Sequence, residues 1–444
     1  MSGLVQQVRE AGIVGAGGAG FPTYMKIDVK VDVVIANGAE CEPLLNKDQV
    51  IMQHHTDDFL DGLQLVMAQC GATKGVIGIK KKHQHSIDVL SGRLPANIEL
   101  MLMENVYPAG DEYELVYEAT GQRIPAGGLP KDIGVLVQNV ETLYNVCRAT
   151  KALPVTHSLI SVHGEVVNPK TAWFPVGTTY RDAINSAGGL LCDDVVIIEG
   201  GPMMGSVTQD LDTPITRTGS GILAVKADSV LARRKSAPEK EYRRIGKSAC
   251  DQCSLCTEMC PRYLLGYPIK PHLVMRSLLT SGETSETLSI NAQACCECNI
   301  CSLWACPEML DPRNVCATTK RDLKANDNWM SAEQLQAKMV DVHPMREYRG
   351  VPTARLIRRL GLNGYDKIKA GFDDTQFHPQ TVVIPLQQHI GAPANLSVAI
   401  GDVVEVGDVI ATAPLDAMCV PMHASIRGTV TAADTTQVTI QAAV

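Results

Sequence analysis

Two cysteine-rich stretches decide how this chain is read: CDQCSLCTEMCP at residues 250–261 and CCECNICSLWACP at residues 295–307. The first spaces its cysteines C-x2-C-x2-C-x3-C-P, and the second repeats this pattern with one extra residue in the last gap. These stretches hold most of the 15 cysteines in a chain of 444 residues. At about 150 residues per domain, such a length predicts roughly three domains, so the cysteines occupy one part of a larger molecule.

This spacing is typical of proteins that bind two [4Fe–4S] clusters. Three thiolates two residues apart bind irons of one cubane, and the fourth cysteine, followed by proline, ligates the other cluster. We therefore assign one cluster to Cys250, Cys253, Cys256 and Cys306, and the other to Cys295, Cys298, Cys301 and Cys260. Two zinc sites are the alternative, but they leave the third cysteine and the Cys-Pro step unexplained.

The other cysteines are expected to be buried small hydrophobes, although Cys296 competes with its neighbour Cys295 as a ligand. They are Cys41, Cys70, Cys147, Cys192, Cys296, Cys316 and Cys419.

Composition narrows the class of protein. The net charge is -8 and aromatic residues make up 4%, which argues against a nucleic-acid binder. We find neither a signal peptide at the N-terminus nor an apolar run of 18 residues, so we expect a soluble, cytoplasmic chain without a transmembrane segment. In a reducing cytosol, clustered cysteines favour metal ligation over disulfides. Leu4, Val5 and Val8 predict a short amphipathic helix that packs on its own domain or, alternatively, docks into a larger assembly.

The pattern along the chain predicts a multidomain α/β protein. Apolar runs at 31–36, 75–79 and 98–103 alternate with helical patterns at 47–70 and 83–91, which indicates a largely parallel, Rossmann-like sheet. The basic run at 233–247 reads as a solvated linker. We predict an α/β domain at 1–150, a β-grasp domain at 151–232, a two-cluster domain at 233–325, a connector at 326–379 and an all-β domain at 380–444.

A glycine-rich loop, Gly15-Ala-Gly-Gly-Ala-Gly20, contains GxGxxG but follows a helix instead of a strand, so alone it is a weak signal for a nucleotide. Its backbone still permits close approach of a phosphate. Polar loops follow the strand-like runs: NGAECEP at 37–43, YPAGDE at 107–112 and QNVET at 138–142. Ligands gather at such strand ends, although each loop taken singly is more often a turn.

Together with GGLP at 127–130 and GGPMMG at 200–205, these segments resemble the flavin- and NADH-binding subunit of respiratory complex I and, more closely, the C subunit of the Rnf electron-transport complex. The resemblance implies FMN on the glycine loop, with NADH stacked on the flavin. For FMN it implies Gly15, Gly17, Gly18, Lys26, Asn37, Tyr107, Gly110, Asp111, Asn139 and Thr142. For NADH it implies Phe21, Glu42 and Glu112. Ala16 and Ala39 depart from the complex I pattern, which has Arg and Asp there.

The later segments also resemble parts of these proteins. Residues 162–189 are similar to their soluble-ligand-binding β-grasp (SLBB) domain, and residues 398–411 to a barrel-sandwich hybrid of the lipoyl type. No lysine occurs from residue 411 onward, so a carrier role on that turn is excluded. The segment QHIGAP at 388–393 lies near the N-terminus in Rnf C subunits. The permuted order seen here resembles the PduS-type cobalamin reductases of the propanediol-utilisation microcompartment.

That resemblance implies an enzyme that passes electrons from NADH through FMN and two [4Fe–4S] clusters to cobalamin, for regeneration of adenosylcobalamin. It implies a bacterial microcompartment as location, with cobalamin adenosyltransferase and shell proteins as partners. Hydride transfer requires no protein acid or base, so we name no catalytic residue. An Rnf-type subunit serving a membrane or ferredoxin partner, and a non-catalytic relay or scaffold protein, are the alternatives.

Overall fold

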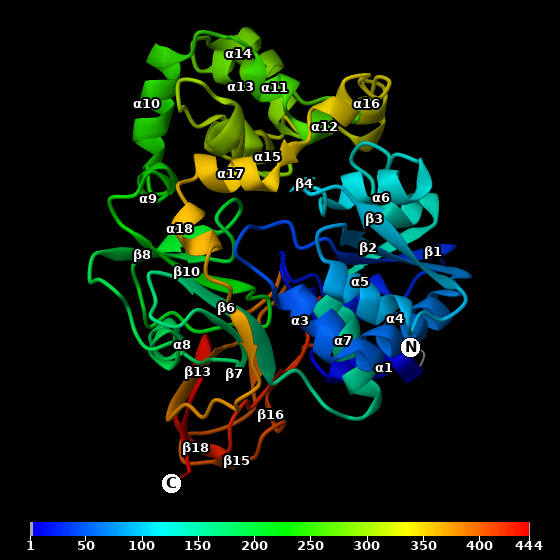
Figure 1. Ribbon diagram of the computed structural model, residues 1–444, viewed down its shortest axis with the longest axis vertical. Coiled ribbons are helices and arrows are strands. Elements are labelled where there is room, and N and C mark those ends of the chain that lie inside the picture. Colours follow the sequence, from blue (N-terminus) through cyan, green and yellow to red (C-terminus); the bar gives the residue numbers. More distant parts are fainter. Residues whose placement is uncertain (1–2, 444) are drawn as a thin grey trace.

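A computed structural model describes residues 3–443 of the chain. Its N-terminal part is a parallel sheet with strand order β3-β2-β1-β5 (Figure 1). The strands are β1 (Val33–Gly38), β2 (Lys74–Lys80), β3 (Ile98–Met103) and β5 (Val135–Asn139). The helices are α3 (Lys47–His54), α4 (Thr56–Cys70), α5 (Gln84–Ser91), α6 (Glu112–Thr120) and α7 (Val140–Thr150). The expected helix at 47–70 is two helices, because His55 leaves the helical conformation at φ −125° and ψ 35°.

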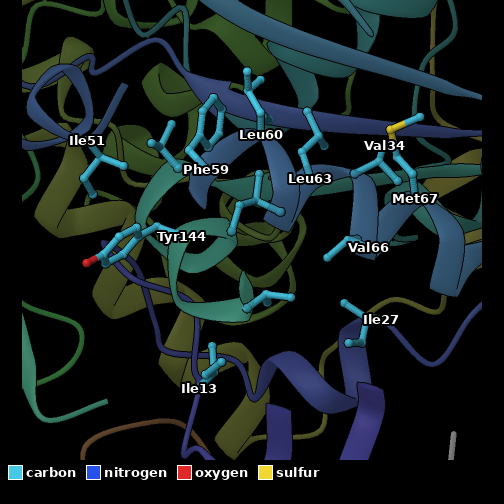
Figure 2. Packing of buried hydrophobic residues seen from close by; sticks show 14 of the residues in the cluster. Ile13, Ile27, Val34, Ile51, Phe59, Leu60, Leu63, Val66, Met67 and Tyr144 are labelled. Carbon is cyan, nitrogen blue, oxygen red and sulfur yellow. The ribbon is translucent and has the colours of Figure 1, made fainter. Parts of the chain in front are cut away.

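The core of this domain forms where α4 and α7 cover one face of the sheet (Figure 2). A Cβ atom at Gly62 of α4 would stand 1.9 Å from the Leu143 carbonyl oxygen of α7, so glycine permits the two backbones to approach closely. The N-terminal helix α1 (Gly3–Glu10) buries Val5 and Val8 completely in the same core. Its apolar face is therefore used within its own domain, which favours that interpretation over a docking peptide.

The next part is a six-stranded sheet of order β12-β7-β6-β10-β8-β9 with one helix, α8 (Tyr180–Ser186). Its strands are β6 (His157–Gly164), β7 (Lys170–Pro175), β8 (Val195–Glu199), β9 (Ser206–Thr208), β10 (Gly221–Lys226) and β12 (Gly371–Asp373). Strand β6 pairs antiparallel with β7 and parallel with β10. Strand β12 comes from the segment at 326–379, so that segment completes the sheet edge.

A layer of helices holds the cysteine motifs (Figure 1, top). It comprises α9 (Val230–Lys235), α10 (Glu239–Ala249), α11 (Leu255–Glu258), α12 (Pro261–Leu264), α13 (Pro271–Ser277), α14 (Gly282–Ser289), η2 (Ile290–Ala292), η3 (Cys301–Ala305) and α15 (Pro312–Ala325). The expectation of a solvated linker at 233–247 is wrong, because α9 and α10 occupy this run. Arg234 donates to the carbonyl oxygens of Ser302 and Leu310 at 2.6 and 3.1 Å, which ties the basic run to the second motif.

The segment at 326–379 joins several parts of the molecule. It contains α16 (Ala332–Gln336), η4 (Arg346–Tyr348), β11 (Val351–Pro352), α17 (Thr353–Arg359) and α18 (Asn363–Asp366) before β12. Strand β11 pairs antiparallel with β4 (Val106–Tyr107) of the α/β domain. Because β12 pairs with the second sheet, this segment fastens the helical layer to both sheets.

The C-terminal part is all β and forms two small sheets. Its strands are β13 (Thr381–Pro385), β14 (Asn395–Leu396), β15 (Val403–Val404), β16 (Val409–Thr412), β17 (Met422–His423), β18 (Gly428–Ala433) and β19 (Gln437–Ala442). Among residues 3–443, no helix has the length and apolar character needed to cross a bilayer.

This β part contacts the glycine loop from the other end of the sequence. The Ile390 amide donates to the Ala19 carbonyl oxygen at 3.1 Å. The buried Arg217 guanidinium donates to the carbonyl oxygens of Gly12 and Pro421, both at 2.8 Å. Its backbone amide donates to the Gln388 side chain at 3.0 Å. The QHIGAP segment is therefore a structural support of the glycine loop.

Candidate functional site

A cavity of about 320 Å³ lies at the carboxyl ends of β1 and β5, a size typical of small-molecule sites. Its lining comes from the α/β domain, the GGPMMG loop and the second cysteine motif. The lining residues are Gly17, Asn37, Glu40, Cys41, Glu42, Leu45, Lys47, Asp48, Tyr107, Pro108, Gly110, Asp111, Glu112, Asn139, Met204, Ser220, Cys296 and Cys298. The polar loops that the sequence marked separately thus meet around one space.

The glycine loop connects α1 to α2 (Thr23–Lys26). The loop is closed by the Gly15 amide, which donates to the Phe21 carbonyl oxygen at 3.0 Å. A Cβ atom built at Gly17 or Gly18 meets no other atom within 4 Å, so the backbone lies open on this side. Gly17 also has φ +89°, which favours glycine. The loop therefore offers uncovered backbone to a phosphate group.

Hydrogen bonds join the loops after β1 and β4. The Asn37 amide group donates to the Gly110 carbonyl oxygen at 2.9 Å, and the Gly110 amide donates to the Cys41 sulfur at 2.6 Å. A Cβ atom at Gly110 would approach that sulfur to 2.9 Å, so the position requires glycine. Burial raises the pKa of the Cys41 thiol, with Lys80 acting in the opposite direction.

Two buried carboxyl groups, Glu40 and Asp48, share one wall of the cavity. The Asp48 amide donates to Glu40 Oε1 at 3.2 Å, and the Asn139 side chain donates to Asp48 Oδ1 at 3.2 Å. Burial and the neighbouring Glu40 raise the pKa of Asp48 to about 7, against the opposing effect of Lys47. The pKa of Glu40 is also raised by burial. The wall therefore holds a proton near neutral pH.

Glu42 fixes the GGPMMG loop. Its carboxylate accepts hydrogen bonds from the amides of Met203 and Met204, each at 2.8 Å. A Cβ atom at Gly201 would stand 2.2 Å from Glu42 Oε2, so the glycine gives this carboxylate room. Burial raises the pKa of Glu42, and these two amide donors oppose the rise.

The helical layer reaches the cavity through Arg262, which follows Cys260-Pro261. Its guanidinium pairs with Asp111 at 2.9 Å, with both side chains about 10% exposed. It also stacks over the Tyr113 ring, 3.4 Å from the centroid. Asp111 in turn caps α6 by accepting from the amides of Tyr113 and Glu114. One buried ion pair thus links the cysteine layer to the predicted flavin loop.

The cysteines predicted for one cluster lie together. The pKa of the Cys256 thiol is raised to about 12 by burial and by the nearby Cys250, Cys306 and Cys253. Cys306, which is far from the other three in the sequence, comes next to them because Pro307 ends the turn that carries it. Four thiols that disfavour one another's ionisation form a donor set suited to cationic iron.

The second set is more crowded. The pKa of the Cys298 thiol is raised by a hydrogen bond with Cys296, by burial, and by the nearby Cys260 and Cys301. Burial and the nearby Cys295 raise the pKa of the Cys301 thiol. Cys295 also contacts Cys316, whose hydrogen bond lowers the Cys295 pKa. Both Cys295 and Cys296 stand beside Cys260, so the choice of Cys295 as ligand stays a prediction.

The extra residue in the second motif is absorbed by a π-helical turn, Cys301–Ala305. A π turn accommodates one more residue than an α turn over the same length. Cys260 and Cys306 consequently leave their turns with nearly the same backbone, φ −72° and ψ 121° against φ −72° and ψ 117°. The longer gap is thus compatible with the ligand role that the shorter one predicts.

The donor sets and the cavity fit the predicted groups. No three His, Cys, Asp or Glu side chains converge on a single metal ion in residues 3–443. A four-iron cubane holds its thiolates farther apart than one ion does, and the two sets of four cysteines match that requirement. The open glycine loop and the amides of Asn37 and Asn139 suit the phosphate and polar ring edges of FMN.

Most predicted flavin and NADH residues meet at the cavity, and some lie beside it. Thr142 accepts a hydrogen bond from the Ala16 amide at 3.0 Å and so holds the glycine loop. Lys26 pairs with Glu112 at 3.5 Å, and Phe21 is exposed. The sequence missed Glu40, Lys47 and Asp48, although they flank the NGAECEP loop. Cys41 and Cys296 are half-buried cavity residues and not core residues, which corrects the expectation for these two cysteines.

Comparison with known proteins confirms the fold class. The Nuo51 FMN-binding domain matches residues 8–148, the SLBB domain 159–207, the 4Fe-4S dicluster domain 249–311 and the RnfC barrel sandwich hybrid domain 374–444. FMN and [4Fe–4S] clusters are accordingly the cofactors of these domains, as predicted.

Individual relatives differ in how much of the chain they match. A solved NAD+-reducing [NiFe]-hydrogenase aligns at TM-score 0.48 and 20% identity, over 85% of this chain and 68% of that one. The RnfC-type component of the proton-translocating ferredoxin:NAD(+) oxidoreductase complex of Clostridium ljungdahlii is 36% identical over 58% of this chain and 55% of its own length. Cobalamin reductase PduS of Salmonella typhimurium is 38% identical over 98% of this chain and 95% of its own length. The chain therefore belongs to the family of the PduS cobalamin reductases, and it is an oxidoreductase.

Proposed function

We propose that this chain is an NADH-dependent cobalamin reductase that passes electrons from NADH through FMN and two [4Fe–4S] clusters to cobalamin. The observation that carries the proposal is the joining of the two candidate sites. Cys296 and Cys298 of the second motif line the same cavity as Asn37, Tyr107 and Asn139. A flavin site and a cluster site that share a wall suit a relay.

FMN would be held at the glycine loop and the strand ends. Gly15, Gly17, Gly18 and Lys26 would hold the phosphate region, and Asn37, Tyr107, Gly110, Asp111, Asn139 and Thr142 the rest. Bound FMN supplies the exchange between two-electron and one-electron chemistry. Phe21, Glu42 and Glu112 would contact NADH. The side chains of Asn37, Glu42 and Asp111 are already positioned by hydrogen bonds, so the site is organised before a ligand arrives.

The clusters would be held by Cys250, Cys253, Cys256 and Cys306, and by Cys295, Cys298, Cys301 and Cys260. Pro261 and Pro307 direct Cys260 and Cys306 each toward the opposite set. The Arg262–Asp111 pair keeps the second set next to the flavin loop. The chain's own residues thus orient the redox groups and hold them at fixed separations.

We further propose that the protein works in a bacterial microcompartment, beside cobalamin adenosyltransferase and shell proteins. This rests on the likeness to PduS over nearly the whole chain. An Rnf-type role is supported less, since the match to the Clostridium ljungdahlii protein covers only 55% of that protein.

The test is an anaerobic electron-transfer assay. Protein reconstituted with iron, sulfide and FMN receives NADH while flavin absorbance is followed, and then receives oxidised cobalamin. We expect flavin bleaching followed by cob(II)alamin or cob(I)alamin. Cys301→Ala should abolish cobalamin reduction, whereas Cys419→Ala, a buried cysteine of the C-terminal β part, should not. Flavin bleaching without cobalamin reduction in the native protein would contradict the proposal and favour a protein acceptor.

A further inference from the structure

The two cysteine sets differ in their position relative to the flavin cavity. Cys296 and Cys298 of the second motif line it. The buried Tyr107 hydroxyl, which faces the same cavity, donates to the Cys298 carbonyl oxygen at 2.7 Å. Cys260, assigned to the second set, precedes the Pro261-Arg262 step that reaches Asp111. Flavin and second set are therefore neighbours.

The sets also differ in their exposure to solvent. Cys295, Cys298, Cys301 and Cys260 are all buried. In the other set Cys253 is exposed and Cys250 half-buried. The two sets adjoin through Cys256 and Cys301, because the Cys256 thiol contributes to raising the Cys301 pKa. The cavity, the buried set, the partly exposed set and solvent thus follow one another.

Side chains of three kinds surround the exposed end. Leu255 and Met309 are 43% and 53% exposed, and they lie two and three residues from Cys253 and Cys306. Arg359 of α17 donates to the Cys306 carbonyl oxygen at 3.3 Å. Arg355 and Arg358 are exposed on the same helix. Asp251 and Glu308 are exposed beside the cysteines.

This mixture matches the chemistry of a corrinoid. A corrin ring has an apolar face, which suits exposed leucine and methionine. Its rim carries amide groups, whose N–H bonds suit the carboxylates of Asp251 and Glu308. Its nucleotide tail carries a phosphodiester, which suits the arginines of α17. A surface with only one of these features would fit many partners, whereas their combination next to a cluster is more selective.

We infer that electrons enter the second cysteine set from the flavin and leave through the Cys250/Cys253/Cys256/Cys306 set, and that a corrinoid docks on the surface formed by Leu255, Met309 and Arg359. This rests on the proposed function for the identity of the acceptor. One NADH gives NAD+, one proton and two electrons. These electrons reduce two Co(III) centres to Co(II), or one Co(III) to Co(I).

The order of the two sets is tested by reducing single-set variants with NADH and recording rapid-freeze EPR spectra. Dithionite added to each variant shows that the remaining cluster is present. In Cys253→Ala we expect NADH to reduce the remaining cluster as in the native protein. In Cys298→Ala we expect dithionite, but not NADH, to reduce it. If Cys298→Ala does not fold, the order in which the two signals appear in native protein decides. The reverse pattern in either experiment would overturn the order.

The docking surface is tested by steady-state kinetics with cobalamin. Leu255→Glu and Met309→Glu should each raise KM for cobalamin about tenfold, or about 1.4 kcal/mol, without changing cluster reduction by NADH. Leu279→Glu, 51% exposed elsewhere in the helical layer, is the matched control and should change neither. An unchanged KM in both test variants would overturn the docking surface. A native protein that reduces no cobalamin fails the proposed function, while the EPR order still tests the relay.

Discussion

The two cysteine motifs have nearly the same backbone but different surroundings. In the first, Gln252 and Ser254 have φ of 60° and 65°, and in the second Glu297 and Asn299 have φ of 59° and 69°. Yet the first motif reaches solvent through Cys253, and the second lies against the flavin cavity. The difference teaches that spacing determines how the thiolates converge, while the residues between and after the cysteines determine what each set faces.

The residue after each Cys-Pro step illustrates this. Arg262 is buried, paired with Asp111 and stacked on Tyr113, whereas Glu308 at the corresponding place is exposed. One position therefore joins the helical layer to the flavin loop, and its counterpart faces solvent.

The largest effect is expected from Arg262→Met. The change leaves the buried Asp111 carboxylate without its cation, which typically costs about 3–5 kcal/mol. Glu308→Gln, the matched change in the second motif, should cost less than about 0.5 kcal/mol. Urea unfolding followed by circular dichroism measures both. Equal losses would show that the two Cys-Pro steps are structurally equivalent after all.

A smaller effect is expected from Asn299→Ala. Alanine is strained at φ 69°, and the buried Asn299 hydrogen bond to the Met203 carbonyl oxygen, 2.9 Å long, is lost. We expect a loss of about 2–3 kcal/mol. Ser254→Ala meets the same backbone strain without that bond and should cost about 1 kcal/mol. Asn299→Gly relieves the strain and isolates the hydrogen bond. If Asn299→Ala and Ser254→Ala melt alike, the Met203 contact contributes nothing.

A pH effect distinguishes the flavin-facing end. The pKa of Asp48 is about 7 in the folded chain, against an ordinary value of 3.8, so the folded state holds a proton that the unfolded state releases. This stabilisation is complete below about pH 4 and is lost as pH rises through about 7, at up to about 1.4 kcal/mol per pH unit. Urea midpoints at pH 5 and pH 8 should therefore differ less in Asp48→Asn than in the native protein. The exposed Asp434→Asn is the control. An identical pH dependence in Asp48→Asn would contradict the role of this carboxyl group.

The smallest effect is expected from Cys296→Ser. Asp251 stands at this place in the first motif, so a ligand is not required there. Iron content should stay at about eight per chain, while Cys295→Ser should lower it to about four. The opposite result would assign the ligand role to Cys296, which contacts Cys298 and lines the cavity.

Spacing and strand ends made much of this structure predictable. The eight-cysteine assignment required only the C-x2-C pattern, and Asn37 and Asn139 were marked because polar residues end the adjacent strands β1 and β5. The fold class was predicted correctly, and the domain boundaries stay a prediction.

Long-range contacts were beyond the sequence. The basic run at 233–247 looked solvated because periodic charge does not reveal that Arg234 would find the Ser302 and Leu310 carbonyl oxygens. Asp48 looked like an ordinary first-turn carboxylate, and only the fold brings Glu40 and Asn139 to it. The extra residue of the second motif was visible in the sequence, but the π turn that absorbs it was not.

The bond between Ile390 and Ala19 also has a consequence for the order in which the molecule is made. A ribosome adds about 5–20 residues per second, so QHIGAP emerges long after the glycine loop that it supports. Until then the loop lacks the contacts of Gln388 and Ile390. The first-made nucleotide loop is therefore completed by some of the last-made residues, and firm capture of the flavin should await nearly full synthesis of the polypeptide.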